Sequence, residues 1–259
     1  GDHRDLHLSL RRQRQMCIRD RCIFKSRTPV YIPKSCKWKG REVDFIEVPE
    51  YVRVWDSGKN FVTTRTFRSK RKRFEARNFL WLCGFYLAEG SVCRQKNGNP
   101  NATHFVQKAD SQSCQKLTEV LDTLGLSYSL AFCRMRYSHS KGITVRVNSA
   151  QLAKFFEDNF GTKEDKKIPP WIFELDRERL KCFLDGFIDG DGWRGEHEVR
   201  MYNTNYRLMC QLVEVALKCG FGVSWREIPP VSNDFAVSRE VEYCVALLRN
   251  RVWARCLPN

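Results

Sequence analysis

Two acidic residues occupy equivalent positions in two glycine-containing stretches. Residues 82–90 read LCGFYLAEG and residues 184–192 read LDGFIDGDG, so Glu89 and Asp191 each stand at the eighth position, before a final glycine. The stretches begin at Leu82 and Leu184, 102 residues apart. Each ends an apolar run with helical spacing, so both acids are expected at helix C-termini.

A carboxylate at a helix C-terminus faces the negative end of the helix dipole, which disfavours it by about 0.3–1 kcal/mol at an exposed site. Two such acids brought together would also repel each other. A bound divalent cation relieves both effects, and hard oxygen ligands suit Mg²⁺. A single acid before glycine is common in turns, but two copies in register favour a functional pair.

Small residues recur four positions apart in both stretches, at Gly84 and Ala88 and at Gly186 and Gly190. Residues with this spacing share one helix face, and small side chains let two helix backbones approach closely. We therefore expect the two helices to pack against each other. Asp189 has Leu87 as its counterpart, so it is interpreted as a local hydrogen-bonding acid near the helix end.

The elements around these helices also repeat. Helices are expected at 74–90, 111–126 and 149–161, and again at 177–192 and 205–220. Short strands are expected at 91–96, 103–109, 128–137 and 142–148, and again at 193–204, 221–228 and 239–249. The chain therefore contains two copies of an αββαββ unit, the first with a further helix.

Arginines recur on the polar side of the expected strands. Ile143, Val145 and Val147 alternate with Thr144 and Arg146. A solvated face of an antiparallel sheet explains this pattern as well as a nucleic-acid platform does. The candidate DNA contacts, chosen from strand alternation, are Arg94, Arg134, Arg136, Arg146, Arg200 and Arg226.

The formal net charge of +15 favours a polyanionic partner, and nucleic acid is the usual one. Residues 1–80 contain 21 Lys and Arg against 9 Asp and Glu, so most of the excess is N-terminal. No apolar run approaches the roughly 20 residues of a membrane span. The 12 cysteines are scattered, without metal-ligand spacing, which favours a reduced protein. We expect an intracellular location, at the nucleoid or in a phage-infected cell.

The expected domain organisation has five parts. Residues 1–22 resemble translated adapter sequence, and we expect a non-native, disordered segment there; a natural basic arm is the alternative. A basic appendage covers 23–73, the first repeat 74–162, a linker 163–175 and the second repeat 176–259. The second repeat barely contains a final helix, which suggests a truncated C-terminus.

The two nonapeptides resemble the LAGLIDADG, or dodecapeptide, motif of homing endonucleases, and the resemblance extends over about residues 74–250. It implies the single-chain, two-motif type: an α+β monomer of two αββαββα halves around a pseudo-two-fold axis. In that family the motif helices pack together, antiparallel saddle sheets bind double-stranded DNA, and the motif acids bind Mg²⁺ or Mn²⁺. Glu89 and Asp191 become catalytic metal ligands, with the carbonyls of Ala88 and Gly190 nearby.

A lysine is also implied by the resemblance. KKIPPWIF at 166–173 resembles a block that precedes the second motif in intein-type members, which makes Lys167 the catalytic candidate and Lys166 its competitor. A solvated linker lysine is the alternative. Two positions depart from the commonest pattern: Glu89 replaces aspartate, and Asp185 stands at a usually small position that is expected to point away from the helix interface.

Three functions remain open from the sequence. The first is a metal-dependent DNA endonuclease that serves the homing of an intron or intein. The second is a non-cleaving maturase or regulator on the same scaffold. The third is a fragment of an intein, although no splice nucleophile and no His-Asn ending are found in this chain.

Overall fold

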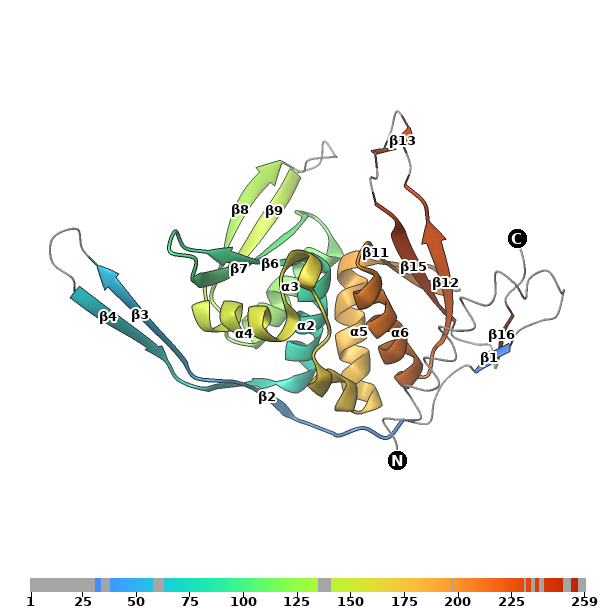
Figure 1. Ribbon diagram of the computed structural model, residues 1–259, viewed down its shortest axis with the longest axis horizontal. Coiled ribbons are helices and arrows are strands. Elements are labelled where there is room, and N and C mark those ends of the chain that lie inside the picture. The colour runs from blue at the N-terminus through green and yellow to red at the C-terminus, as the bar shows by residue number, and fades with distance from the viewer. Residues whose placement is uncertain are drawn as a thin grey trace. The chain divides into compact units, whose positions relative to one another are not determined.

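The computed structural model describes residues 31–33, 38–57, 63–134, 141–196, 198–230, 232–233, 236–237, 240–248 and 253–255 (Figure 1). The adapter-like segment 1–22 and Arg136 lie outside the described residues. The chain forms two compact units. One comprises Lys39–Trp193, and the other comprises Gly1–Trp38 with Arg194–Asn259. Each unit is described separately below.

Four α-helices belong to the 39–193 unit. They are α2 (Ala76–Glu89), α3 (Gln112–Thr123), α4 (Ala150–Phe160) and α5 (Arg177–Asp191). Each is capped at its N-terminus by a side chain that accepts hydrogen bonds from amides of the first turn. The capping residues are, in order, Glu75, Ser111, Ser149 and Asp176. Gly161 ends α4 with a φ of 74°, which glycine adopts without strain.

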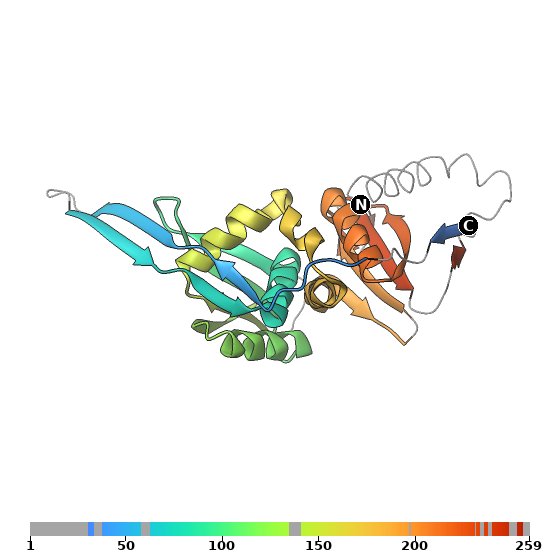
Figure 2. The same ribbon diagram turned by 90° about the horizontal axis from the view of Figure 1, so that it is seen from below.

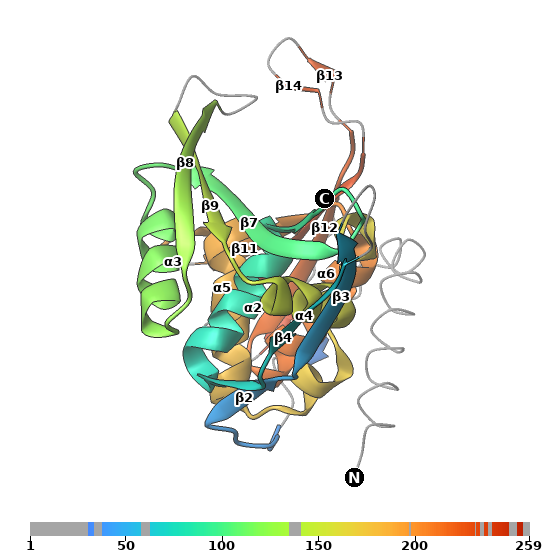
Figure 3. The ribbon, with the colours of Figure 1, turned by 90° about the vertical axis from the view of Figure 1, so that its left-hand side faces the viewer.

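A four-stranded antiparallel sheet in this unit has the order β6-β7-β9-β8. Its strands are β6 (Gly90–Arg94), β7 (Pro100–Lys108), β8 (Tyr128–Arg134) and β9 (Lys141–Val147). Helices α2, α3 and α4 contact β7 (Figure 3). On β9, Ile143, Val145 and Val147 are buried, whereas Thr144 and Arg146 are only partly so, as the sequence alternation predicts.

Residues 39–75 lead into α2 through two strand pairs. Strand β2 (Phe45–Val48) pairs with β5 (Lys72–Glu75), and β3 (Tyr51–Ser57) pairs with β4 (Thr63–Ser69). The β3–β4 pair forms a ribbon that leads away from the helices of the unit (Figure 1).

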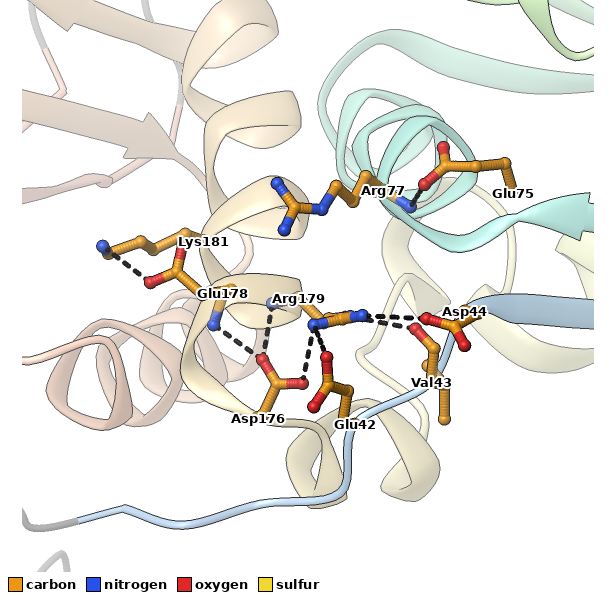
Figure 4. Close-up of polar contacts among 9 residues, drawn as sticks. All are labelled: Glu42, Val43, Asp44, Glu75, Arg77, Asp176, Glu178, Arg179 and Lys181. Carbon is orange, nitrogen blue, oxygen red and sulfur yellow. Dashed lines mark hydrogen bonds and ion pairs between the residues drawn. The ribbon is translucent and has the colours of Figure 1, made fainter.

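Two short 3₁₀ helices, η2 (Lys163–Asp165) and η3 (Pro170–Glu174), connect α4 with α5. Buried Arg179 of α5 then anchors the segment before β2 (Figure 4). Its guanidinium donates to the carbonyl of Val43 at 2.9 Å and to the carboxylates of Glu42 at 2.9 Å and Asp44 at 3.3 Å. Arg179 therefore connects the segment before β2, which leads to the β3–β4 ribbon, with α5, the second motif helix.

The second four-stranded sheet has the order β10-β11-β15-β12. Its strands are β10 (Gly192–Arg194), β11 (Glu198–Asn203), β12 (Gly222–Ile228) and β15 (Glu242–Leu248), with α6 (Tyr206–Lys218) packed on β11, β12 and β15. Strands β13 (Ser232–Asn233) and β14 (Ala236–Val237), which come between β12 and β15 in the sequence, pair with each other. Strand β1 (Tyr31–Pro33) pairs with β16 (Trp253–Arg255).

The two sheets have the same topology. If the four strands of each sheet are numbered by their order in the sequence, their spatial order is 1-2-4-3 in both sheets. A helix connects the second strand to the third in each. The expected α+β fold with two antiparallel sheets and a repeated element order is therefore confirmed. None of the helices within the described residues is long and apolar enough to cross a bilayer.

The compact units do not follow the expected repeat boundary. The 39–193 unit contains the linker 163–175 and also α5, the motif helix of the second repeat. The reason is packing, since α5 packs against α2 and lies beside it in both views (Figures 1 and 2). The motif helices therefore belong to one unit, and the site that they form lies within it.

Candidate active site at the paired helix ends

The motif helices α2 and α5 approach closely at two glycines. A Cβ added at Gly84 would lie 1.9 Å from the carbonyl oxygen of Phe183, and a Cβ added at Gly186 would lie 1.9 Å from that of Trp81. Both positions face backbone of the other helix, which cannot rotate out of the way as a side chain does. The absence of a side chain at each position is therefore required for this pairing.

Further along the pair, the small residues bring the acidic ends together. A Cβ added at Gly190 would lie 2.5 Å from the Cβ of Ala88 and 3.1 Å from the Cγ of Glu89. The side chain of Glu89 therefore lies against the last turn of α5, directly before Asp191. Both acids are partly buried. All four interface positions singled out in the sequence, Gly84, Ala88, Gly186 and Gly190, lie between the helices.

Burial raises the pKa of the Glu89 carboxyl above its usual value, while a hydrogen bond with Gln107 and the positive charge of Lys166 oppose the shift. Gln107 lies on β7 and is buried. It shares the inward face of the strand with Thr103 and Phe105. In the sequence, Gln107 stands out as a polar residue at an inward position of an alternating strand.

Lys166 lies beside both acids, whereas Lys167 is exposed. The Nζ of Lys166 donates to the carbonyls of Tyr86 and Leu87, each at 3.0 Å, and lies 5.2 Å from the centre of the Tyr86 ring. Burial lowers the pKa of Lys166 to about 8, and the charges of Asp191 and Glu89 oppose that shift. The structure thus brings the competitor lysine to the helix ends; the backbone amide of Lys167 bonds to Phe160.

Asp189 makes long-range contacts in addition to its place near the helix end. Its carboxylate accepts from the indole nitrogen of Trp81 on α2 at 2.8 Å and from the Nζ of Lys116 on α3 at 2.6 Å. Its backbone carbonyl accepts from the hydroxyl of Ser113 at 2.6 Å. These contacts tie the end of α5 to α2 and α3, and local sequence gave no sign of them, because the partners lie 73 to 108 residues away.

Three of the candidate DNA-binding arginines, Arg94, Arg134 and Arg146, lie on described strands of the first sheet. Exposed Arg94 forms an ion pair with Glu157 of α4 and donates to the carbonyl of Gly98 at 2.9 Å. Arg146 donates to Asn148 at 3.0 Å and lies 3.2 Å from His104. Arg134 ends β8.

The remaining candidates belong to the second sheet. Arg200 on β11 forms an ion pair with Glu198, and Arg226 on β12 is exposed. They lie in the other compact unit.

The donor set at the helix ends fits a divalent cation. Within the described residues no three His, Cys, Asp or Glu side chains cluster as a closed metal site. Mg²⁺ needs no such cluster, because it is commonly held by one or two carboxylates, with waters and substrate phosphates filling its other positions. The two acids, Glu89 and Asp191, match that requirement, and a cation would also offset the burial of Glu89.

No family model matches the chain. Among curated proteins, it is 31% identical over 150 residues to "Replication factor C small subunit" of Methanocaldococcus jannaschii, covering 52% of this chain and 8% of that protein. It is 32% identical over 122 residues to "DNA-directed RNA polymerase subunit Rpo1C" of the same organism, covering 44% and 12%. A third relative is the "Iron-sulfur cluster assembly SufBD family protein ML0593" of Mycobacterium leprae, at 21% over 145 residues, covering 55% and 16%. The chain thus spans about a tenth of the length of these relatives.

Solved structures with similarity to the chain include I-DmoI in complex with DNA and Mn, at 13% identity and a TM-score of 0.46, covering 66% of this chain and 89% of that one. Full-length DUF199/WhiA from Thermatoga maritima is 11% identical with a TM-score of 0.45, covering 66% and 50%.

Proposed function

We propose that the chain is a site-specific DNA endonuclease of the LAGLIDADG type, which hydrolyses phosphodiester bonds of double-stranded DNA with a divalent metal. One observation carries the proposal: the acids of two duplicated motifs meet at one end of a glycine-packed helix pair, with a partly buried lysine beside both. Structural acids are seldom brought together in this way, because the like charges repel. A shared ligand explains their retention better than stability does.

In this proposal Glu89 and Asp191 hold Mg²⁺ or Mn²⁺. When bound, such an ion supplies charge neutralisation at the phosphate and a water that ionises more readily. The carboxylates set where the ion lies, and partial burial limits competition from bulk water. Gln107, which hydrogen-bonds Glu89, fixes the orientation of that carboxylate. It is therefore proposed as a positioning residue.

Lys166 is proposed as the basic group of the site, in place of Lys167. Its Nζ is held by two carbonyls at the end of α2 and is close enough to both acids to interact with their charges. A cation at this place stabilises negative charge that develops on a phosphate, which typically contributes 100-fold or more to rate. The substrate phosphate would then complete the charge balance of the site.

The polar face of the β6-β7-β9-β8 sheet is proposed to bind the DNA. Arg146, His104 and Ser91 form one cross-strand row on this face, and Arg94 stands at the end of β6. Arginines at base edges read sequence, whereas those at phosphates position the duplex. Arg94 and Arg146 are already held by protein groups, so their directions are set before DNA binds.

The curated relatives support a mobile element as the context. Their printed names describe a replication factor, an RNA polymerase subunit and an iron-sulfur assembly protein, which share no activity. Each matches this chain over 8–16% of its length. A segment that has been inserted into unrelated genes explains this distribution, and a homing endonuclease within an intein or intron is such a segment.

The test is cleavage of a randomised duplex library in Mg²⁺ or Mn²⁺, followed by sequencing of the new ends. The wild-type chain should yield one recurrent site, and Glu89→Gln or Asp191→Asn should abolish the product. Asp185→Asn is the matched control, since it removes a carboxylate from the same helix α5 away from its end, and it should retain cleavage. Binding to the library without any cleavage would favour the non-cleaving maturase or regulator instead.

A further inference from the structure

The β3–β4 ribbon and the residues directly after it are rich in basic side chains. Between Tyr51 and Arg73 the sequence contains eight Lys and Arg but one acid, Asp56. The strands form seven consecutive cross-strand pairs, from Tyr51 with Ser69 to Ser57 with Thr63. At about 3.3 Å per residue the ribbon is about 23 Å long. Figure 1 shows it leading away from α2 and α4.

The base of the ribbon is fixed to α4 by one buried amide. Gln151, in the first turn of α4, is 4% exposed. Its Oε1 accepts from the hydroxyl of Ser69 at 2.7 Å, and its Nε2 donates to the carbonyls of Pro49 at 2.6 Å and Lys70 at 2.9 Å. These contacts hold both strands where they leave the core. The direction of the ribbon is therefore set by the fold.

One face of the ribbon continues toward the first sheet. Arg53 and Phe67 are cross-strand partners, and the guanidinium lies 5.9 Å from the ring centre. Nη1 of Arg53 also donates to the side chain of Gln95 at 3.2 Å, and Gln95 follows directly after β6. The ribbon therefore runs beside the edge where β6 turns into β7, next to the polar face proposed to bind DNA.

The charge of the ribbon's foot exceeds what its acidic neighbours offset. Five consecutive or near-consecutive basic residues are exposed there, namely Arg68, Lys70, Arg71, Lys72 and Arg73. Among the described residues the acids that pair with them are Glu47 and Glu50, at 3.1 to 3.9 Å. Exposed pairs of this kind are worth little, so phosphates can replace them.

We propose that the β3–β4 ribbon is an arm that binds the phosphate backbone of double-stranded DNA beyond the segment held by the β6-β7-β9-β8 sheet. The choice of DNA as the partner rests on the proposed function. A ribbon of about 23 Å spans about seven base pairs, at one phosphate charge per about 1.7 Å of duplex. The arm thus lengthens the contact on one side and contributes affinity without base-specific readout.

The experiment measures binding of the full chain to a random-sequence 40-bp duplex over a series of salt concentrations. The ribbon variant Arg65→Gln/Arg68→Gln/Arg71→Gln removes three charges from β4 and the residues directly after it, without touching Gln151 or Arg53. The control variant Lys163→Gln/Arg177→Gln/Lys181→Gln removes three charges between α4 and the first turns of α5. The ribbon variant should lower the slope of log affinity against log salt by about 2 to 3, since each phosphate contact contributes about 0.9. The control should match wild type.

The outcomes separate this inference from the proposed function. Equal loss in both variants, or a wild-type slope in the ribbon variant, overturns the arm. If the wild-type chain cleaves DNA and the ribbon variant has the wild-type salt slope, the proposed endonuclease function stands and the arm does not. A ribbon-dependent slope without cleavage keeps the arm and removes the nuclease. Unchanged melting temperatures check that both variants fold. If the triple variant does not fold, Arg68→Gln alone replaces it, with an expected slope lower by about 1.

Discussion

The ends of α2 and α5 carry the same sequence motif but have different surroundings. Each helix ends with an acid before a glycine. Each also has a glycine, Gly84 or Gly186, at which an added Cβ would lie 1.9 Å from a backbone carbonyl oxygen of the other helix. At the end of α2, the cation Lys166 binds the carbonyls of Tyr86 and Leu87. At the end of α5, the hydroxyl of Ser113 binds the carbonyl of Asp189, the counterpart of Leu87.

This difference has a simple origin in connectivity. A duplicated chain contains two repeats but one linker between them, and Lys166 lies in that linker, just after η2. At the other helix end, the group that binds the carbonyl comes from the first turn of α3. Duplication therefore makes the helix pair symmetric, whereas the polar groups around it depend on which element packs at each end.

The largest effect should come from breaking the symmetric part. Gly84→Ala and Gly186→Ala each place a methyl group on backbone atoms of the other helix, so each should cost about 3 kcal/mol of unfolding free energy. Denaturant unfolding measures both. Gly98→Asn is the control, at a turn where an added Cβ meets nothing within 4 Å and asparagine tolerates the φ of 84°. Clearly unequal losses at Gly84 and Gly186 would contradict the equivalence of the two positions.

The asymmetric cation should matter for rate and not for stability. Lys166→Met keeps the apolar stem and removes a partly buried charge, so cleavage should fall about 100-fold while stability changes little. Lys167→Met alters an exposed neighbour and should leave cleavage within a few-fold of wild type. Single-turnover rates at saturating protein separate this effect from DNA binding. A larger loss in Lys167→Met would restore that residue as the catalytic candidate.

The anchor of α5 should contribute less. Asp189→Leu introduces the residue found at the equivalent place in the first repeat and leaves the Trp81 indole N–H without its acceptor, at a cost of about 2 kcal/mol. Asp189→Asn keeps an acceptor for Trp81 and loses the charge opposite Lys116, so it should cost about half as much. Thermal unfolding of the two variants gives the comparison. Identical melting temperatures for wild type and Asp189→Leu would show that these contacts do not hold the helix end.

The smallest effect tests reciprocity between the small residues. In Gly190→Ala the new Cβ meets the Cβ of Ala88 at 2.5 Å, a clash between methyl groups at the helix ends, so a loss of about 1 kcal/mol is expected. Exchanging the pair, as Ala88→Gly/Gly190→Ala, removes the clash and should recover most of that loss. The double-mutant cycle measures the coupling directly. Additive losses would mean that the two positions do not contact each other.

The sequence predicted the helix pair and missed most of the polar site. Small residues four apart and acids in register are local patterns, and the repeat made them recognisable. Gln107 and Ser113 carry no such pattern, because each reaches the helix ends from an element that is local to neither motif. The segment 166–173 limited the candidates for the catalytic lysine to Lys166 and Lys167. It did not predict which of the two lies beside the acids.

The sequence by itself determined the α+β class, the duplication, the order of helices and strands and the acids at the helix ends. Periodicity and glycine placement act over a few residues, so they can be read from one chain. Only the tertiary structure decided that Lys166, rather than Lys167, lies beside Glu89 and that Gln151 holds the β3–β4 ribbon. These contacts join segments far apart in the chain, and their energies depend on burial and distance, which local sequence does not encode.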